Sequence, residues 1–115
     1  MNLDWSRIEE LISPEDPDDV LWLKGYLNDL IVAYDGYFTE LNEGLNKRDQ
    51  KNVISILHQM KGVAANNGLE TVFSLIKDNE QYSKENNLDK VFSQRAILKE
   101  NWDLTKKEIQ KKFNL

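Results

Sequence analysis

Apolar residues recur at helical spacing along most of the chain. Between positions 17 and 45 they return at steps of three and four, at Val20, Leu23, Leu27, Leu30, Tyr34, Tyr37, Leu41 and Leu45. Further stripes of this kind predict helices at about 3–12, 50–66, 69–85 and 89–113, and no stretch shows the strict alternation of a strand. The pattern therefore predicts one all-α domain over residues 1–115, an antiparallel up-and-down four-helix bundle with a short extra N-terminal helix.

Capping residues mark where these helices begin and end. Asp16 precedes a proline and two further acids, which is typical of a helix N-terminus. Asp49 and Asp89 are expected to cap the helices that follow them. Gly44 and the polar run Asn46-Lys47-Arg48 are expected to mark the end of the first long helix. Gly68 is expected to end the next one by adopting the left-handed backbone conformation.

The segment 50–66 holds His58, the only histidine of the chain. On a helical wheel of about 100° per residue the apolar side chains form one narrow stripe, and His58 lies roughly 130° from its centre. The ring is therefore expected to point away from the core, with Lys61 one turn further along the same side. Gly62 follows, and a glycine inside a helix costs about 1 kcal/mol relative to alanine. Its presence suggests that something bulky approaches the backbone there.

The order His58-Gln59-Met60-Lys61-Gly62, with Gly68 six residues after Gly62, resembles the histidine-containing phosphotransfer (HPt) domains of bacterial and eukaryotic phosphorelays. The likeness extends to the length, the helical pattern and the place of the motif near mid-chain. The resemblance implies that His58 accepts a phosphoryl group from the aspartate of a receiver domain and passes it to another receiver. The implied partners are the receiver domains of response regulators and hybrid histidine kinases.

The resemblance also implies a role for each residue around the ring. In such domains a ring nitrogen that faces solvent is the nucleophile. Lys61 would neutralise phosphoryl oxygens, and Gly62 would leave room for the loops of the receiver. Two positions depart from the family pattern. Val63 follows the glycine where many members have serine, and Glu80 stands where members often have a glutamine that bonds the imidazole. As a carboxylate, Glu80 would orient the ring and raise its basicity.

No cofactor of the chain's own is implied, because the magnesium ion in such a transfer belongs to the acidic pocket of the receiver. The chain has no glycine-rich phosphate loop, so it is not expected to bind ATP or phosphorylate itself. It would act as a stoichiometric carrier and not as an enzyme. One histidine and no cysteine also argue against a metal site.

Hydropathy and charge exclude several other classes of protein. The longest apolar run, 30–34, is far shorter than the ~20 residues of a membrane span, and no signal peptide precedes it, so we expect a cytoplasmic protein. Residues 1–45 carry eleven acids against two bases, and residues 46–115 carry nine acids against thirteen bases. This asymmetry is either an ordinary solvated surface or a weak positive field that favours an acidic partner. The sequence lacks the basic stripe that is typical of a nucleic-acid-binding protein.

Two alternatives remain open at the level of the sequence. The chain could be a helical adaptor that docks a receiver domain or another signalling partner without accepting phosphate. It could also be a module of a hybrid kinase, although its initial methionine and early helix favour a free-standing protein. Trp22 and Trp102 are expected to fill core and boundary positions, and because one bundle can house the apolar residues we expect a monomer.

Overall fold

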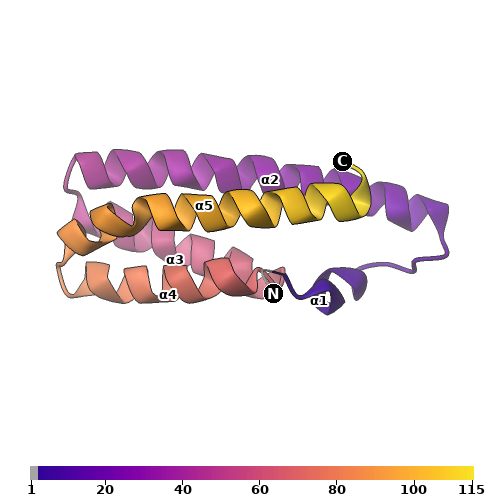
Figure 1. Ribbon diagram of the computed structural model, residues 1–115, viewed down its shortest axis with the longest axis horizontal. Helices are drawn as coiled ribbons and strands as arrows, with labels where there is room; N and C mark the ends of the chain where they lie inside the picture. Colours follow the sequence, from indigo (N-terminus) through magenta and orange to yellow (C-terminus); the bar gives the residue numbers. More distant parts are fainter. Residues whose placement is uncertain (1–2) are drawn as a thin grey trace.

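The computed structural model describes residues 3–115, which contain helices and no strand (Figure 1). Residues 1 and 2, which the predicted domain includes, lie outside the described part. The elements are α1 (Trp5–Glu9), α2 (Pro17–Asn46), α3 (Gln50–Asn66), α4 (Glu70–Lys84) and α5 (Leu88–Phe113). The four long helices begin and end within one residue of the predicted bounds, whereas α1 is shorter than the predicted 3–12.

The four long helices form an antiparallel bundle, and the chain as a whole measures 48 × 22 × 20 Å (Figure 1). Helix α2 packs against α3 and α5, and α4 packs against the same two helices, so each helix has two main neighbours. Helix α1 lies beside the end of the bundle where α2 begins. The predicted four-helix bundle with a short N-terminal helix is confirmed.

Two of the predicted N-terminal caps are present. The Asp16 carboxylate accepts a hydrogen bond of 2.9 Å from the backbone N–H of Asp18, and Pro17 occupies the first helical position of α2. The Asp49 carboxylate accepts a bond of 3.2 Å from the N–H of Asn52 at the start of α3. These bonds satisfy backbone donors that the first turn of a helix leaves unpaired.

The expected cap of the last helix was wrong by two residues. Asn87 caps α5, because its side-chain oxygen accepts a bond of 3.3 Å from the N–H of Lys90. Asp89 lies inside the first turn, where its negative charge still suits the helix dipole.

The predicted end of α2 at Gly44 and the polar run 46–48 agrees with the structure, although Gly44 itself lies inside the last turn. Helix α2 continues past it to Asn46, and the left-handed residue that follows the helix is Arg48, with φ of 54°. Gly44 is buried, and a Cβ atom at this position would lie 3.1 Å from a methyl group of Val53. The missing side chain therefore allows α2 and α3 to approach closely near their connection.

Gly68 ends α3 as expected and also holds the N-terminal segment. Its φ of 68° lies in the left-handed region, and the N–H of Leu69 bonds the carbonyl of Ala64 over 2.9 Å, as in a Schellman motif. The Gly68 carbonyl accepts a bond of 2.7 Å from the N–H of Asp4. A Cβ atom at Gly68 would lie 2.6 Å from the Asp4 carbonyl oxygen, so only glycine fits.

One continuous apolar core fills the centre of the bundle. Trp102 is fully buried there, as predicted, and its ring packs against Tyr34 with 4.6 Å between centroids. Trp22 differs from the expectation, because its side chain is 54% exposed and stacks on Tyr26 at the surface. The tryptophan of α2 therefore contributes little to the core.

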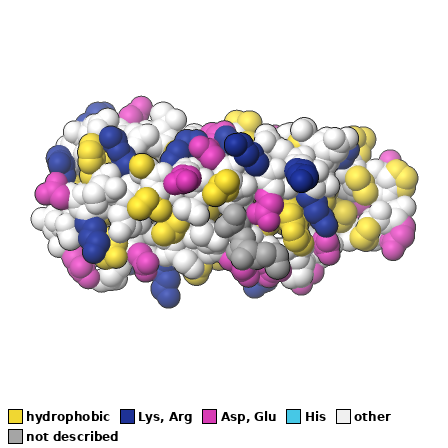
Figure 2. Space-filling view, viewed as in Figure 1, with side chains coloured by type: hydrophobic (Ala, Val, Ile, Leu, Met, Phe, Trp, Pro, Cys, Tyr) yellow, Lys and Arg dark blue, Asp and Glu magenta, His cyan; other side chains and the backbone are white. Residues whose placement is uncertain are grey.

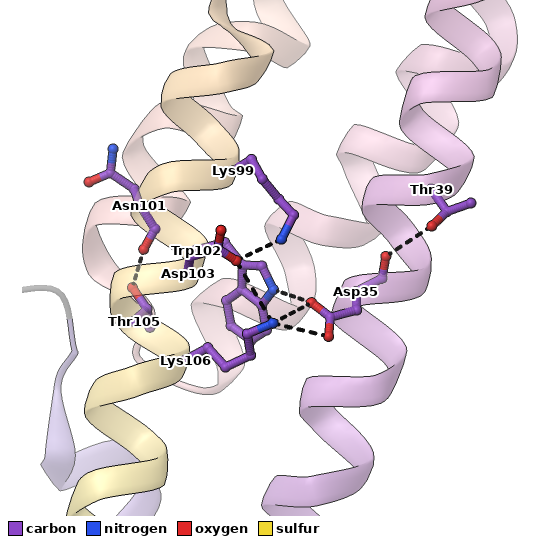
Figure 3. Close-up of polar contacts among 8 residues, drawn as sticks. All are labelled: Asp35, Thr39, Lys99, Asn101, Trp102, Asp103, Thr105 and Lys106. Carbon is purple, nitrogen blue, oxygen red and sulfur yellow. Dashed lines mark hydrogen bonds and ion pairs between the residues drawn. The ribbon is translucent and has the colours of Figure 1, made fainter.

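A polar cluster fastens α2 to α5 (Figure 3). The Asp35 carboxylate accepts hydrogen bonds from the Trp102 indole N–H at 2.7 Å and from the Lys106 ammonium at 3.2 Å. Burial acts to raise the pKa of Asp35, but these two bonds outweigh it, so the pKa lies below its usual value. Asp35 therefore stays ionised at neutral pH and fixes the orientation of the Trp102 ring.

Candidate functional site

His58 projects from α3 away from the bundle core. Its side chain is 69% exposed, whereas Leu57 and Met60 on the same helix are fully buried. The outward orientation predicted from the helical wheel is confirmed. No histidine is visible on the face drawn in Figure 2, where acidic, basic and hydrophobic side chains are interspersed.

Glu80 reaches the ring from the neighbouring helix α4. Its Oε1 atom lies 3.0 Å from Nδ1 of His58, and only 3% of its side chain is exposed. The buried stripe of α4 begins with apolar Val72 and Ile76 and then continues with polar residues. Helix α4 thus buries a carboxylate where an apolar side chain would otherwise continue the core. This carboxylate faces the histidine.

Two lysines share this carboxylate with the imidazole. Lys61 of α3 places its ammonium 2.6 Å from Oε2 of Glu80, and Lys84 of α4 lies 3.3 Å from Oε1. Burial acts to raise the pKa of Glu80, but the bonds from Lys61, His58 and Lys84 together lower it to about 2. The carboxyl group is therefore ionised at neutral pH, and the two cations compensate its burial.

An ionised Glu80 fixes the tautomer of the neutral imidazole. A carboxylate can only accept hydrogen bonds, so Nδ1 of His58 must carry the proton and donate it to Glu80. The lone pair of the neutral ring is then on Nε2. Within residues 3–115 no hydrogen bond occupies Nε2, and this nitrogen is available to an electrophile from outside the chain.

The backbone beside the ring is uncovered. Gly62 is exposed, and a Cβ atom built on it would meet no atom within 4 Å. Ala65, one turn further, is also exposed. No contact within the described chain requires a glycine at position 62. Its role in leaving clearance for a partner stays a prediction. Val63 and Ala64 turn toward the bundle and offer no hydroxyl group.

The four residues predicted for the site lie together, and Lys61 has a partner in the chain that was not predicted. Its ammonium rests on Glu80 and its side chain is 29% exposed, so the cation is held beside the imidazole by the carboxylate. Lys84 was not predicted. Its spacing of four residues from Glu80 on one helix is a signal that could have indicated it.

Residues 3–115 contain neither a metal-holding cluster nor a membrane-spanning helix. Among residues 3–115 no group of three or more histidine, aspartate or glutamate side chains is placed to hold a metal ion. In the same part of the chain no helix is both long and apolar enough to cross a bilayer. A hollow of about 190 Å³ beside Glu80 is lined by Lys61, Lys77, Asp78, Glu80, Gln81 and Lys84.

Comparison with known proteins adds no identification. Neither protein-family models, nor curated proteins, nor solved structures gave a match to the chain.

Proposed function

We propose that this protein is a phosphorelay intermediate that carries a phosphoryl group on His58. It accepts the group from a phosphorylated receiver-domain aspartate and passes it to the aspartate of another receiver. In this role it resembles HPt domains and needs neither ATP nor a cofactor of its own.

The observation that carries the proposal is the state of the imidazole. The ring is exposed, Nδ1 is bonded to an ionised carboxylate, and within residues 3–115 Nε2 has no hydrogen-bond partner, while Gly62 leaves the neighbouring backbone open. A neutral imidazole nitrogen is a good nucleophile near neutral pH. A structural surface histidine would need neither a buried carboxylate behind it nor an open glycine beside it.

The transfer step follows from this geometry. The Nε2 lone pair forms a bond to phosphorus while the bond from phosphorus to the aspartate oxygen breaks, and the electron pair of that bond stays on the aspartate. The phosphoryl group is highly charged during transfer, so nearby cations lower the barrier. Lys61 and Lys84 are the cations available within the site.

Transfer from a labelled receiver tests the proposal. The purified chain is incubated with ³²P-phosphorylated receiver domains encoded in the same genome, and the products are separated on a denaturing gel. We expect the label to move to this chain in a form that is labile to acid and stable to alkali, as phosphohistidine is. His58→Gln should abolish the transfer while the helical circular dichroism spectrum is unchanged, because the side chain is exposed.

Two results would oppose the proposal. Label that persists in His58→Gln would place the phosphoryl group on another residue. Receivers that bind the chain without ever labelling it would favour the helical adaptor.

A further inference from the structure

The outward face of α2 exposes apolar side chains that the bundle does not use. Leu21 is 71% exposed and Val32 is 72% exposed, and Trp22 borders the same face at 54% exposure. At about 100° per residue, Leu21 and Val32 lie opposite the buried stripe of the helix. These side chains are spread over about 16 Å of the helix, and a partner that lies along the helix would cover them.

Two glycines lie in the same narrow sector of the helix. Gly25 and Gly36 are exposed, and a Cβ atom at either would meet nothing within 4 Å. Neither is needed for packing within the described chain, although glycine inside a helix lowers its stability. A glycine on a helix surface allows another backbone or a large side chain to approach closely.

The two large residues, Leu21 and Val32, and the two glycines, Gly25 and Gly36, are spaced so that the helix face can fit a second copy of itself. Leu21 and Gly36 lie at equal distances on either side of the midpoint between residues 28 and 29, and so do Gly25 and Val32. If two copies of α2 pair in antiparallel fashion about that midpoint, each leucine and each valine meets a glycine of the other copy. Such an arrangement is what a two-fold symmetric interface requires, since one patch must fit itself.

Size and charge limit the strength of such a pair. The stretch from Leu21 to Gly36 is about 22 Å long, so the interface is smaller than the ~800 Å² per partner of a standard stable complex. Helix α2 also carries six acidic residues against one lysine, and Asp29 adjoins the midpoint in both copies. Repulsion between these charges makes the pairing weak at low salt and stronger when salt screens it.

We propose that this protein forms a weak antiparallel homodimer through the outward face of α2, with Leu21 and Val32 of each copy seated on Gly36 and Gly25 of the other. His58 stays accessible in this dimer, because its ring leans toward α4, which does not adjoin α2 as a main neighbour. The dimer departs from the monomer expected from the sequence. It does not depend on phosphoryl transfer, so either proposal can fail alone.

Sedimentation equilibrium of the full chain measures the association directly. Over roughly 10 µM to 1 mM protein, the average mass should rise from the 13.5 kDa of one chain toward twice that value. Raising NaCl from about 50 mM to 0.5 M should strengthen the association. Val32→Lys should weaken it by about tenfold or more, and Asp29→Asn should strengthen it. Ile97→Lys is the matched control, since Ile97 is 49% exposed on α5 and should not affect the mass.

Single cysteines test the orientation, because the natural chain has none. Asn28→Cys, next to the two-fold axis, should give a disulfide-linked dimer under mild oxidation. Glu43→Cys, on the same face but far from the axis, should not. A disulfide at Glu43→Cys would mean parallel pairing, because position 43 then meets its own copy, and would overturn the proposal, as would a constant monomer mass. A monomer in which Val32→Lys abolishes receiver binding would also overturn it, because the face would then belong to the receiver.

Discussion

The Glu80 carboxylate meets three nitrogen partners, and its roles can be separated by substitution. Glutamine keeps an oxygen that can accept the Nδ1 proton of His58, whereas leucine keeps the volume and loses the acceptor. We expect Glu80→Gln to accept phosphate at a rate within about tenfold of the natural protein. Glu80→Leu should be slower by about a hundredfold, because the ring is then free to rotate and to change tautomer.

Single-turnover transfer from a labelled receiver measures both rates. Circular dichroism distinguishes a chemical effect from unfolding. Equal rates for the two variants would show that the hydrogen bond to the ring does not assist transfer.

The lowered pKa of Glu80 also predicts how stability depends on pH. Its pKa is about 2 in the folded protein, against an ordinary value of 4.5. The ionised carboxyl therefore stabilises the fold fully above about pH 4.5, and this contribution is lost as the pH falls toward 2. We expect a loss on the order of 2 kcal/mol over that range.

Urea titrations at several pH values measure this loss. Glu80→Gln should lose less free energy of unfolding between pH 5 and pH 2 than the natural chain does. Identical acid profiles for the two proteins would contradict the assigned ion pairs with Lys61 and Lys84.

A substitution at Gly62 tests whether the missing side chain leaves room for the receiver domain. Gly62→Gln should raise the free energy of unfolding by about 0.5–1 kcal/mol, because glutamine favours the helix and space is open there. The same variant should weaken receiver binding, which calorimetric titration can measure. Ala96→Gln, on the exposed face of α5, is the control for a larger side chain far from the ring. A receiver that binds Gly62→Gln undiminished would refute the clearance role.

At the scale of the elements, the apolar stripes were sufficient to predict the four long helices. The caps at Asp16 and Asp49 and the turn at Gly68 follow from local backbone chemistry, so the sequence contains them. Gly44 and Trp22 could not be assigned in the same way. The environment of each depends on which helix lies opposite, and that is a tertiary contact.

The candidate site, like the fold, could be predicted where it depends on one helix and not where it depends on contacts between helices. The outward direction of His58 is a property of α3 alone, whereas the convergence of Lys61 and Lys84 on Glu80 depends on how α3 and α4 are aligned. The place of Lys61 one turn after His58 follows from α3 alone, but its ion pair with Glu80 does not. In the folded chain a buried carboxylate on the next helix holds it.

Gly68, in the connection between α3 and α4, is a test of how the N-terminal segment is held. Gly68→Ala should lower the free energy of unfolding by about 2–3 kcal/mol, since alanine is strained at positive φ and its Cβ displaces the Asp4 backbone. Gly62→Ala is the matched control and should stabilise the chain by up to about 1 kcal/mol. Urea denaturation followed by circular dichroism measures both changes. A neutral Gly68→Ala would mean that the N-terminal segment does not dock there.

At the scale of the whole molecule, the bundle presents different surfaces on different helices. The imidazole, Glu80 and the two lysines lie where α3 meets α4. Helix α2 carries exposed apolar side chains and an excess of acids. Phosphoryl exchange and self-association would thus use separate faces, and a dimer could present two carrier histidines at once.

The central claim is that Nε2 of His58 is the open nucleophile and that Nδ1 is held by Glu80. The most direct test is to phosphorylate ¹⁵N-labelled protein with phosphoramidate and record long-range ¹H–¹⁵N spectra of the imidazole. Because the chain has one histidine, a single ring appears in the spectrum. We predict a phosphoryl group on Nε2 with the proton retained on Nδ1. Phosphorylation at Nδ1, or a ring that remains unmodified, would contradict the claim.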